Sequence, residues 1–339
     1  MDKKTQDLQD KKDIEIETNS PMEIITASDK NKFTMNDNDD NKDAVQKIIY
    51  LIKCLSDEKK ENTLTNELEE IRKTIREKKA ELISGDLILV NKWTSLEPSY
   101  VPEDLIEIPD NDSSETIKCS IPGLQIKKSV YEALTNMFIS AKNAGYDDLV
   151  VISGYRSYDL QDTLYKNEVN KLKQKYGEQN AEKKAAEVVA PPGTSEHQAG
   201  LAIDLTISSF LQEADPLVEE FGQTAQGKWL QENSWKYGFI IRYLPDKKDL
   251  TGIIYEPWHL RYVGMPHSEI MYKNNWCLEE YLEFIKEKEH VQFKEYDIFY
   301  SKVPLPEEVF IKEFGDEIKY SISGNGYDGY IITIAKNNS

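Results

Sequence analysis

The sequence predicts an α+β fold, in which a small antiparallel sheet is flanked by helices, with a helical extension before this domain and a β-rich tail after it. Short apolar runs typical of strands lie at residues 149–152, 201–205, 238–243 and 252–255, and segments with helical periodicity separate most of them. Residues 289–339 differ, because they alternate in the strand manner and carry a Gly-Asn-Gly hairpin turn.

Composition divides the 339-residue chain into four predicted segments. Residues 1–42 are polar and charged and predict a disordered tail. Residues 43–84 predict a helical extension, because apolar side chains recur at three- and four-residue steps in a narrow stripe that suits a coiled-coil pair or a helical hairpin. Weak self-association through these helices is a further expectation, limited by the shortness of the stripe. Residues 85–288 are the predicted main domain, and residues 289–339 are the tail.

The main domain opens with an apolar run at residues 86–91, which predicts a short strand, followed by a loop rich in Pro, Asp and Ser at residues 103–123. A helix is predicted over residues 129–144, because its apolar positions keep a 3.6-residue period and Gly145 follows it. The apolar run at residues 149–152 has the composition of a buried strand.

The remaining predicted elements, in chain order, are helices over 158–176 and 183–188, a strand over 201–205, a mostly helical segment over 210–237, strands over 238–243 and 252–255, and a helix over 278–288. Two of these strands lead to polar side chains. One carries Asp204, and the strand over 252–255 delivers Glu256 and His259. We therefore expect two or three strands to bring their functional ends together at a cleft.

The charge balance excludes one class of partner. The chain has 61 acidic and 42 basic side chains, which gives a formal net charge of −19. A nucleic-acid surface needs clustered Lys and Arg, so we expect no nucleic-acid partner. The three cysteines, Cys54, Cys119 and Cys277, are far apart in the sequence and predict no disulfide framework.

The N-terminal sequence shows no secretory leader. Residues 1–43 are polar throughout and lack an apolar h-region. The longest apolar run near the start, at residues 48–52, is too short to span a bilayer. We expect the protein to be located in the cell envelope if an export signal or anchor is missing from this chain, and in the cytoplasm otherwise.

His197 and His259, two of the four histidines, each lie close to a carboxylate in the sequence. His197 is followed by Asp204, and His259 is preceded by Glu256. Zn²⁺ takes imidazole nitrogen and carboxylate oxygen, and a catalytic zinc usually has three protein ligands. His197, Asp204 and His259 could supply that set and leave Glu256 as a base. On spacing alone, the alternative that these residues lie on a polar surface stays open. The other two histidines, His267 and His290, lie outside these stretches.

Three motifs occur in one order. They are Ser153-Gly154-Tyr155-Arg156-Ser157, then Ser-x-His-x-x-Gly-x-Ala-x-Asp ending at Asp204, then Glu-x-Trp-His-x-Arg-Tyr-Val-Gly beginning at Glu256. Together they resemble the VanY-type zinc D-alanyl-D-alanine carboxypeptidases, whose relatives include LdcB-like L,D-carboxypeptidases. The resemblance covers roughly residues 85–287. It implies a zinc peptidase fold of that type and a zinc cofactor.

The resemblance also implies roles for side chains and a substrate. It implies that His197, Asp204 and His259 bind zinc and that Glu256 is the general base. Arg156 would bind the transition state or the substrate carboxylate. The residues implied to contact substrate are Ser195, Gln161, Tyr155 and Trp258. The implied partner is a peptidoglycan stem peptide ending in D-alanine, cut by a D,D-carboxypeptidase. An L,D-carboxypeptidase, an endopeptidase and a binding module that uses the same cleft stay open as alternatives.

Overall fold

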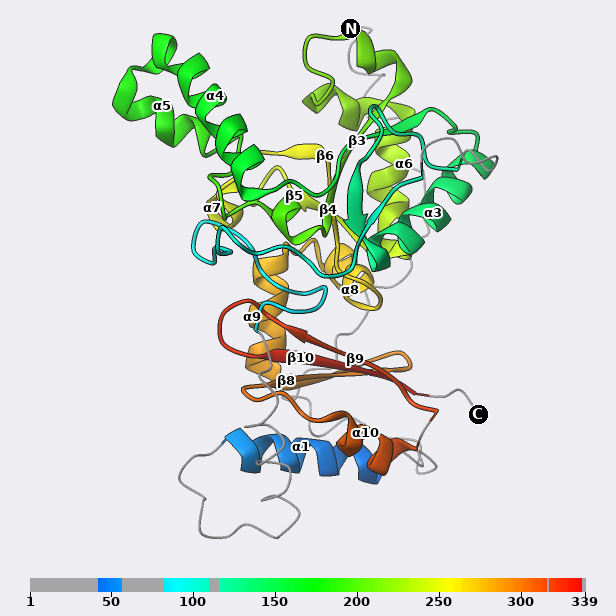
Figure 1. Cartoon of the computed structure of the whole chain (residues 1–339). Helices are drawn as coiled ribbons and strands as arrows, with labels where there is room; N and C mark the ends of the chain where they lie inside the picture. The colour runs from blue at the N-terminus through cyan, green and yellow to red at the C-terminus, as the bar shows by residue number, and fades with distance from the viewer. Residues whose placement is uncertain (1–41, 57–81, 110–115, 316, 337–339) are drawn as a thin grey trace, which may run out of the picture.

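The computed structural model describes residues 42–56, 82–109, 116–315 and 317–336. The predicted tail, up to residue 41, and most of the second predicted helix of the extension, over residues 57–81, lie outside these residues. Two layered units are stacked in Figure 1. The upper unit holds a four-stranded sheet with its helices, and the lower unit holds a second four-stranded sheet. None of the described helices is both long enough and apolar enough to cross a bilayer.

The upper sheet, called here the catalytic sheet, is antiparallel with strand order β3-β4-β6-β5. Its strands are β3 (Leu149–Ser153), β4 (Ala202–Ile207), β5 (Phe239–Tyr243) and β6 (Glu256–Tyr262). One face packs on α3 (Lys128–Asn143) and α6 (Ala225–Asn233) through a core that includes Leu134, Ile203 and Leu230. The predicted α+β fold with a small antiparallel sheet flanked by helices is thus confirmed.

The opposite face of the catalytic sheet carries polar side chains, because residues alternate between faces along a strand. On β4, Ile203 and Leu205 join the apolar core, whereas Asp204 points to the other side. Near that side, the predicted helix over 158–176 forms as α4 (Tyr158–Tyr176). The helix expected over 183–188 forms earlier, as α5 (Glu178–Ala185), because its two alanines pack against α4. The two helices project together from the sheet in Figure 1.

The apolar run predicted as a strand over 86–91 is not one. Its side chains alternate between two cores: Ile88 belongs to the core of the catalytic sheet, and Leu89 to the core beside the lower sheet. Its backbone is held by the lower unit, since Leu89 N donates to Asn325 O at 3.0 Å and Leu87 N donates to Ser323 Oγ at 2.9 Å. The run is apolar because it is clamped between two units, and not because it pairs in a sheet.

Three other predicted elements need correction. The expected loop over 103–123 contains β1 (Leu105–Glu107), which pairs with β2 (Gln125–Lys127). The segment over 210–237 is not one mostly helical stretch but a series of short turns of 3₁₀-helix around α6. The strand expected over 252–255 begins only at Glu256, so Glu256 and His259 lie on β6 itself. For β1 and β6, pairing with another strand, which local sequence does not show, set the observed bounds.

The lower sheet is antiparallel with strand order β7-β8-β10-β9. Its strands are β7 (His290–Phe293), β8 (Tyr296–Ser301), β9 (Lys319–Gly324) and β10 (Tyr330–Ala335). One face packs on α9 (Leu278–Lys288), whose predicted bounds are confirmed, and on α8 (His267–Asn274). The other face packs on α1 (Lys42–Ser56) and α10 (Glu307–Phe314). Both helices lie beneath the sheet in Figure 1.

The packing of α1 shows where the stripe of the first predicted helix lies, whereas its expected coiled-coil or hairpin partner, over residues 57–81, is outside the described residues. Its stripe, which includes Val45, Ile48 and Ile52, is buried with Phe299 of β8 and Phe310 of α10. The stripe is narrow because only one side of α1 packs against the lower sheet and α10. The division of the chain at residues 84 and 288 stays a prediction.

Candidate metal centre

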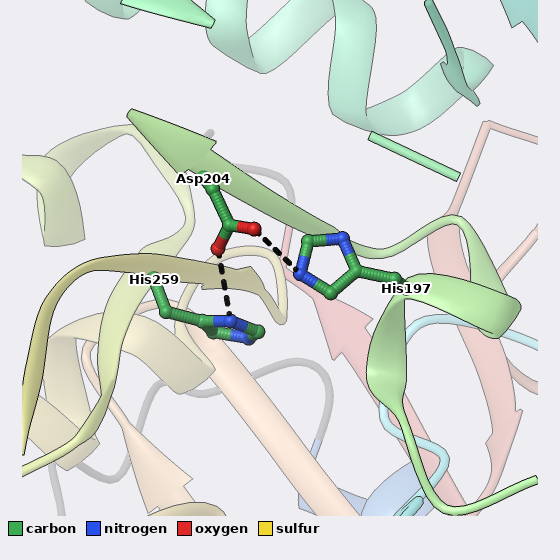
Figure 2. A group of neighbouring side chains, drawn as sticks. All are labelled: His197, Asp204 and His259. Atoms are coloured by element: carbon green, nitrogen blue, oxygen red, sulfur yellow. Dashed lines mark ion pairs between the residues drawn. The ribbon is translucent and has the colours of Figure 1, made fainter. Parts of the chain in front are cut away.

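Three side chains on two strands and one short turn meet on the polar face of the catalytic sheet (Figure 2). Asp204 of β4 and His259 of β6 are directly opposite each other in the antiparallel ladder. His197 lies on a 3₁₀ turn, Glu196–Ala199, that ends at Gly200 with φ +67°. A Cβ at Gly200 would lie 2.8 Å from Leu105, so both the positive φ and the close approach favour glycine there. The turn therefore delivers His197 beside the strand that carries Asp204.

The geometry of these three side chains fits a zinc ion. Asp204 Oδ2 lies 3.2 Å from His197 Nε2, and Asp204 Oδ1 lies 3.2 Å from His259 Nδ1. One ligand atom from each of the three residues lies within 4.8 Å of the others, whereas ligands about 2.0–2.1 Å from a tetrahedral zinc are separated by about 3.3 Å, so the set would close slightly around an ion. Neither His197 Nε2 nor Asp204 Oδ1 makes a hydrogen bond with any described residue, although both atoms are buried. Buried polar atoms without partners are costly, so this set is suited to a cation.

Hydrogen bonds select the nitrogen that each histidine presents. His197 Nδ1 donates to the carbonyl oxygen of Gly154 at 2.7 Å, so Nε2 carries the lone pair and faces Asp204. His259 is turned the other way. Its Nδ1 faces Asp204, and its Nε2 faces the carboxylate of Glu196 at 3.7 Å. The two rings stand perpendicular with centroids 4.9 Å apart.

The charges around the centre keep Asp204 ionised. Burial opposes the ionised form, but His197 and His259 outweigh it and hold the pKa of Asp204 well below its usual range. Burial and the nearby Arg156 guanidinium lower the pKa of His197 to about 4, so this imidazole is neutral at pH 7. Burial alone would lower the pKa of His259, but Asp204 and Glu196 reverse the sign and raise it to about 9. A divalent cation would take the place of that proton.

Glu256 lies on β6 three residues before His259, a spacing that places two side chains on opposite faces of a regular strand. The ladder is irregular here. Ile241 pairs with Leu260 and Tyr243 pairs with Glu256, so one residue of β5 is opposite three of β6. This bulge, which contains Pro257, turns Glu256 toward the same cleft, where its Oε2 lies 3.7 Å from His259 Nδ1. Burial raises the pKa of Glu256 to about 8.

The centre opens into a cleft of about 180 Å³. Among the residues predicted to contact substrate, Arg156, Ser195, Gln161 and Trp258 line this cleft. Gln161, on α4, donates through Nε2 to Ala190 O at 2.7 Å, and its Oε1 makes no hydrogen bond with a described residue. Tyr155 is not among the lining residues, although it lies next to Arg156 in the same motif. Its backbone N donates instead to Gln125 O at 2.6 Å.

Several residues around the centre carry no role in the sequence-based prediction. Tyr243 is buried with its ring centroid 4.8 Å from that of His259, and Asp215 and Ile253 also line the cleft. Glu196 is fully buried and bonded to two buried arginines. A signal was present, since Glu196 stands inside the histidine motif and both arginines interrupt apolar strands. Of the other histidines, His267 is bonded to Tyr281 and His290 to Asp297, away from the centre.

Comparisons with known proteins agree with this geometry. A family model described as VanY, D-alanyl-D-alanine carboxypeptidase, matches residues 123–265, which include all four strands of the catalytic sheet. A D-alanyl-D-alanine carboxypeptidase of Enterococcus faecium is 34% identical over 281 residues, which cover 81% of this chain and 82% of the relative. The bifunctional D-Ala-D-Ala dipeptidase and carboxypeptidase VanXYC of Enterococcus gallinarum is 39% identical over 200 residues, covering 59% of this chain and 94% of the relative.

One solved structure is similar over most of the chain. It is described as the vancomycin resistance D,D-dipeptidase VanXYg in complex with a D-Ala-D-Ala phosphinate analogue. It is 34% identical, covers 76% of this chain and 96% of its own, and has a TM-score of 0.58. The similarity thus extends beyond the motifs to the arrangement of the sheet and its helices.

Proposed function

Because the chain belongs to the VanY family of D-alanyl-D-alanine carboxypeptidases, we propose that it is a zinc D,D-carboxypeptidase that removes the C-terminal D-alanine of peptidoglycan stem peptides. The observation that carries the proposal is the set of His197, Asp204 and His259 in zinc-binding geometry, with Glu256 beside it in one cleft. A module that only binds peptidoglycan would need no buried carboxylate next to the metal ligands.

The residues of the cleft have different roles in the proposed hydrolysis. His197 Nε2, Asp204 and His259 Nδ1 would hold the zinc, which when bound supplies a Lewis acid that polarises the scissile carbonyl and activates water near neutral pH. Glu256 takes the proton of the attacking water and returns it to the leaving amine. Burial raises the pKa of Glu256 to about 8, and the positive charge of a cation bound beside it would lower that pKa again, so that the ionised carboxylate can accept the proton near neutral pH.

Arg156 supplies positive charge at the same place. It lines the cleft, and its charge interacts with Asp204 and Glu256. Its Nε is buried and makes no hydrogen bond with a described residue. A guanidinium fork binds a carboxylate through two parallel hydrogen bonds, which suits a side chain that recognises the free end of a peptide. We assign Arg156 to the terminal carboxylate of the substrate.

The reaction class is tested with three soluble stem peptides and product masses. A pentapeptide ending in D-Ala-D-Ala is expected to lose one D-alanine. A tetrapeptide with a single terminal D-alanine is expected to be cut far more slowly, and a pentapeptide with an amidated end is expected to resist cleavage. Faster cleavage of the tetrapeptide would make the enzyme an L,D-carboxypeptidase. Efficient cleavage of the amidated peptide would make it an endopeptidase.

Substituting Arg156→Lys is expected to lower kcat/KM on the pentapeptide by about 10²-fold or more, although the charge is kept, because lysine lacks the planar fork. The control is the amidated pentapeptide. If Arg156 binds the terminal carboxylate, the loss from Arg156→Lys and the loss from amidation will not add, since both remove the same interaction. Additive losses would place Arg156 on the oxyanion of the transition state instead.

Two further proposals concern placement. The proposed substrate is part of the cell wall, which supports a cell-envelope location. Weak self-association is proposed for the stripe of Leu64, Leu68, Ile71 and Ile75. The stripe of α1 is unsuited to that role, because it is buried against the lower sheet.

A further inference from the structure

The carboxylate of Glu196 is fully buried, and its two oxygens have different neighbours. Oε1 accepts two charge-assisted hydrogen bonds of 2.7 Å, one from Arg242 Nε and one from Arg261 Nη1. Both arginine side chains are themselves fully buried. Oε1 thus satisfies two guanidiniums at once, and the orientation of the carboxylate is set by this contact.

The second oxygen of Glu196 faces the metal centre. Oε2 lies 3.7 Å from His259 Nε2, and neither atom makes a hydrogen bond with any described residue. The far nitrogen of His259, Nδ1, faces Asp204. An imidazole that binds a metal through one nitrogen carries its proton on the other, and a buried N–H needs an acceptor. Among the described residues, Glu196 is the carboxylate that faces this nitrogen.

We propose that Glu196 is a positioning residue for His259: its Oε2 accepts the Nε2–H and so fixes the ring with Nδ1 toward the zinc. This role rests on the proposed function, since it concerns the same zinc. Glu196 is not itself a ligand in this arrangement, because it lies on the opposite side of the His259 ring from Asp204.

The arginines that hold Glu196 are anchored in turn from outside the catalytic sheet. Arg242 makes a bidentate pair with Glu279 of α9, at 2.7 and 2.8 Å. Arg261 Nη2 donates to the carbonyl oxygens of Asp86 and Ile88, both at 2.8 Å. These are parts of the chain that pack against the lower unit. The lower unit therefore contributes to the position of a zinc ligand without reaching the cleft.

A simpler role for Glu196 is that of a counter-charge for two buried arginines. Both arginines bind Oε1, so this role does not explain why Oε2 faces His259. The two roles differ in what they predict for an isosteric amide. In Glu196→Gln the two guanidiniums need the amide oxygen, so the amide NH₂ is left to face His259 Nε2. Two donors would then oppose each other, and the ring would lose its acceptor.

The test measures zinc affinity by chelator competition in the full chain, together with the His259 Nε2–H proton in the zinc-loaded protein by NMR. Glu196→Gln is expected to weaken zinc binding by about 10–100-fold, the usual effect of losing a hydrogen-bond partner of a metal ligand. Its Nε2–H signal is expected to exchange faster with water. Glu196→Asp keeps the charge that the arginines need, but is too short to reach both, and is expected to weaken zinc in the same direction.

The matched control is Glu280→Gln, which removes the carboxylate next to Glu279 in the sequence. The Glu280 carboxylate is paired with Lys247 and not with Glu196 or its arginines. It is expected to keep wild-type zinc affinity. If Glu196→Gln fails to fold, the zinc affinity and the Nε2–H signal of Glu196→Asp test the positioning role instead. Wild-type affinity and an unchanged Nε2–H signal in a folded Glu196 variant would overturn the positioning role alone. A wild-type chain that binds no zinc would overturn the proposed function with it.

Discussion

Substituting His259→Ala is expected to remove zinc from the purified protein and to abolish peptide hydrolysis. His259 lies opposite Asp204 in the ladder, and no other described histidine besides His197 reaches the centre. With one of three ligands gone, Asp204 and His197 would hold the metal only weakly, and without metal the scissile carbonyl loses its Lewis acid. Elemental analysis of protein purified without added zinc, alongside turnover of the pentapeptide, measures both effects.

The control for this substitution is His290→Ala. His290 is bonded to Asp297 at the start of the lower sheet and is far from the cleft in sequence and in fold. That variant is expected to keep near-stoichiometric zinc and full activity. Full zinc content in both His197→Ala and His259→Ala would show that the ion, if present, binds elsewhere.

Substituting Glu256→Gln is expected to leave zinc and fold intact while lowering kcat by about 10²–10⁴-fold, the usual contribution of a general base. Glutamine has the same shape as glutamate, so the substitution is expected to leave the backbone of the bulge in β6 unchanged. It cannot take a proton from water, and the metal ligands are untouched. Zinc content, far-ultraviolet circular dichroism and kcat on the pentapeptide together separate chemistry from binding.

The matched control is Glu187→Gln. Glu187 stands beside the cleft residue Val188 but is paired with Lys184 and Lys248, and it does not line the cleft. This variant is expected to turn over like the wild type. Near wild-type kcat in Glu256→Gln would mean that another group is the base. Loss of zinc in that variant would make Glu256 a ligand and put Asp204 in doubt.

The sequence by itself supplied the side chains of the candidate zinc set and the longest local elements. His197, Asp204 and His259 are residue types that bind zinc, and the three motifs in their order, more than the spacing alone, pointed to them. The helix over Tyr158–Tyr176 was predicted with its observed bounds because its signals are local. Ser157 caps it by accepting from Leu160 N, and Gly177 follows its last turn.

Only the tertiary structure decided which distant residues share a face or a core. The bulge between β5 and β6, which turns Glu256 toward His259, depends on how two strands pair. The burial of the α1 stripe against the lower sheet depends on residues more than 200 positions away. The same holds for Glu196, whose neighbours Arg242 and Glu279 lie on separate elements. Local periodicity tells that a side chain is buried, but its partner is set by long-range pairing and packing, which no local pattern records.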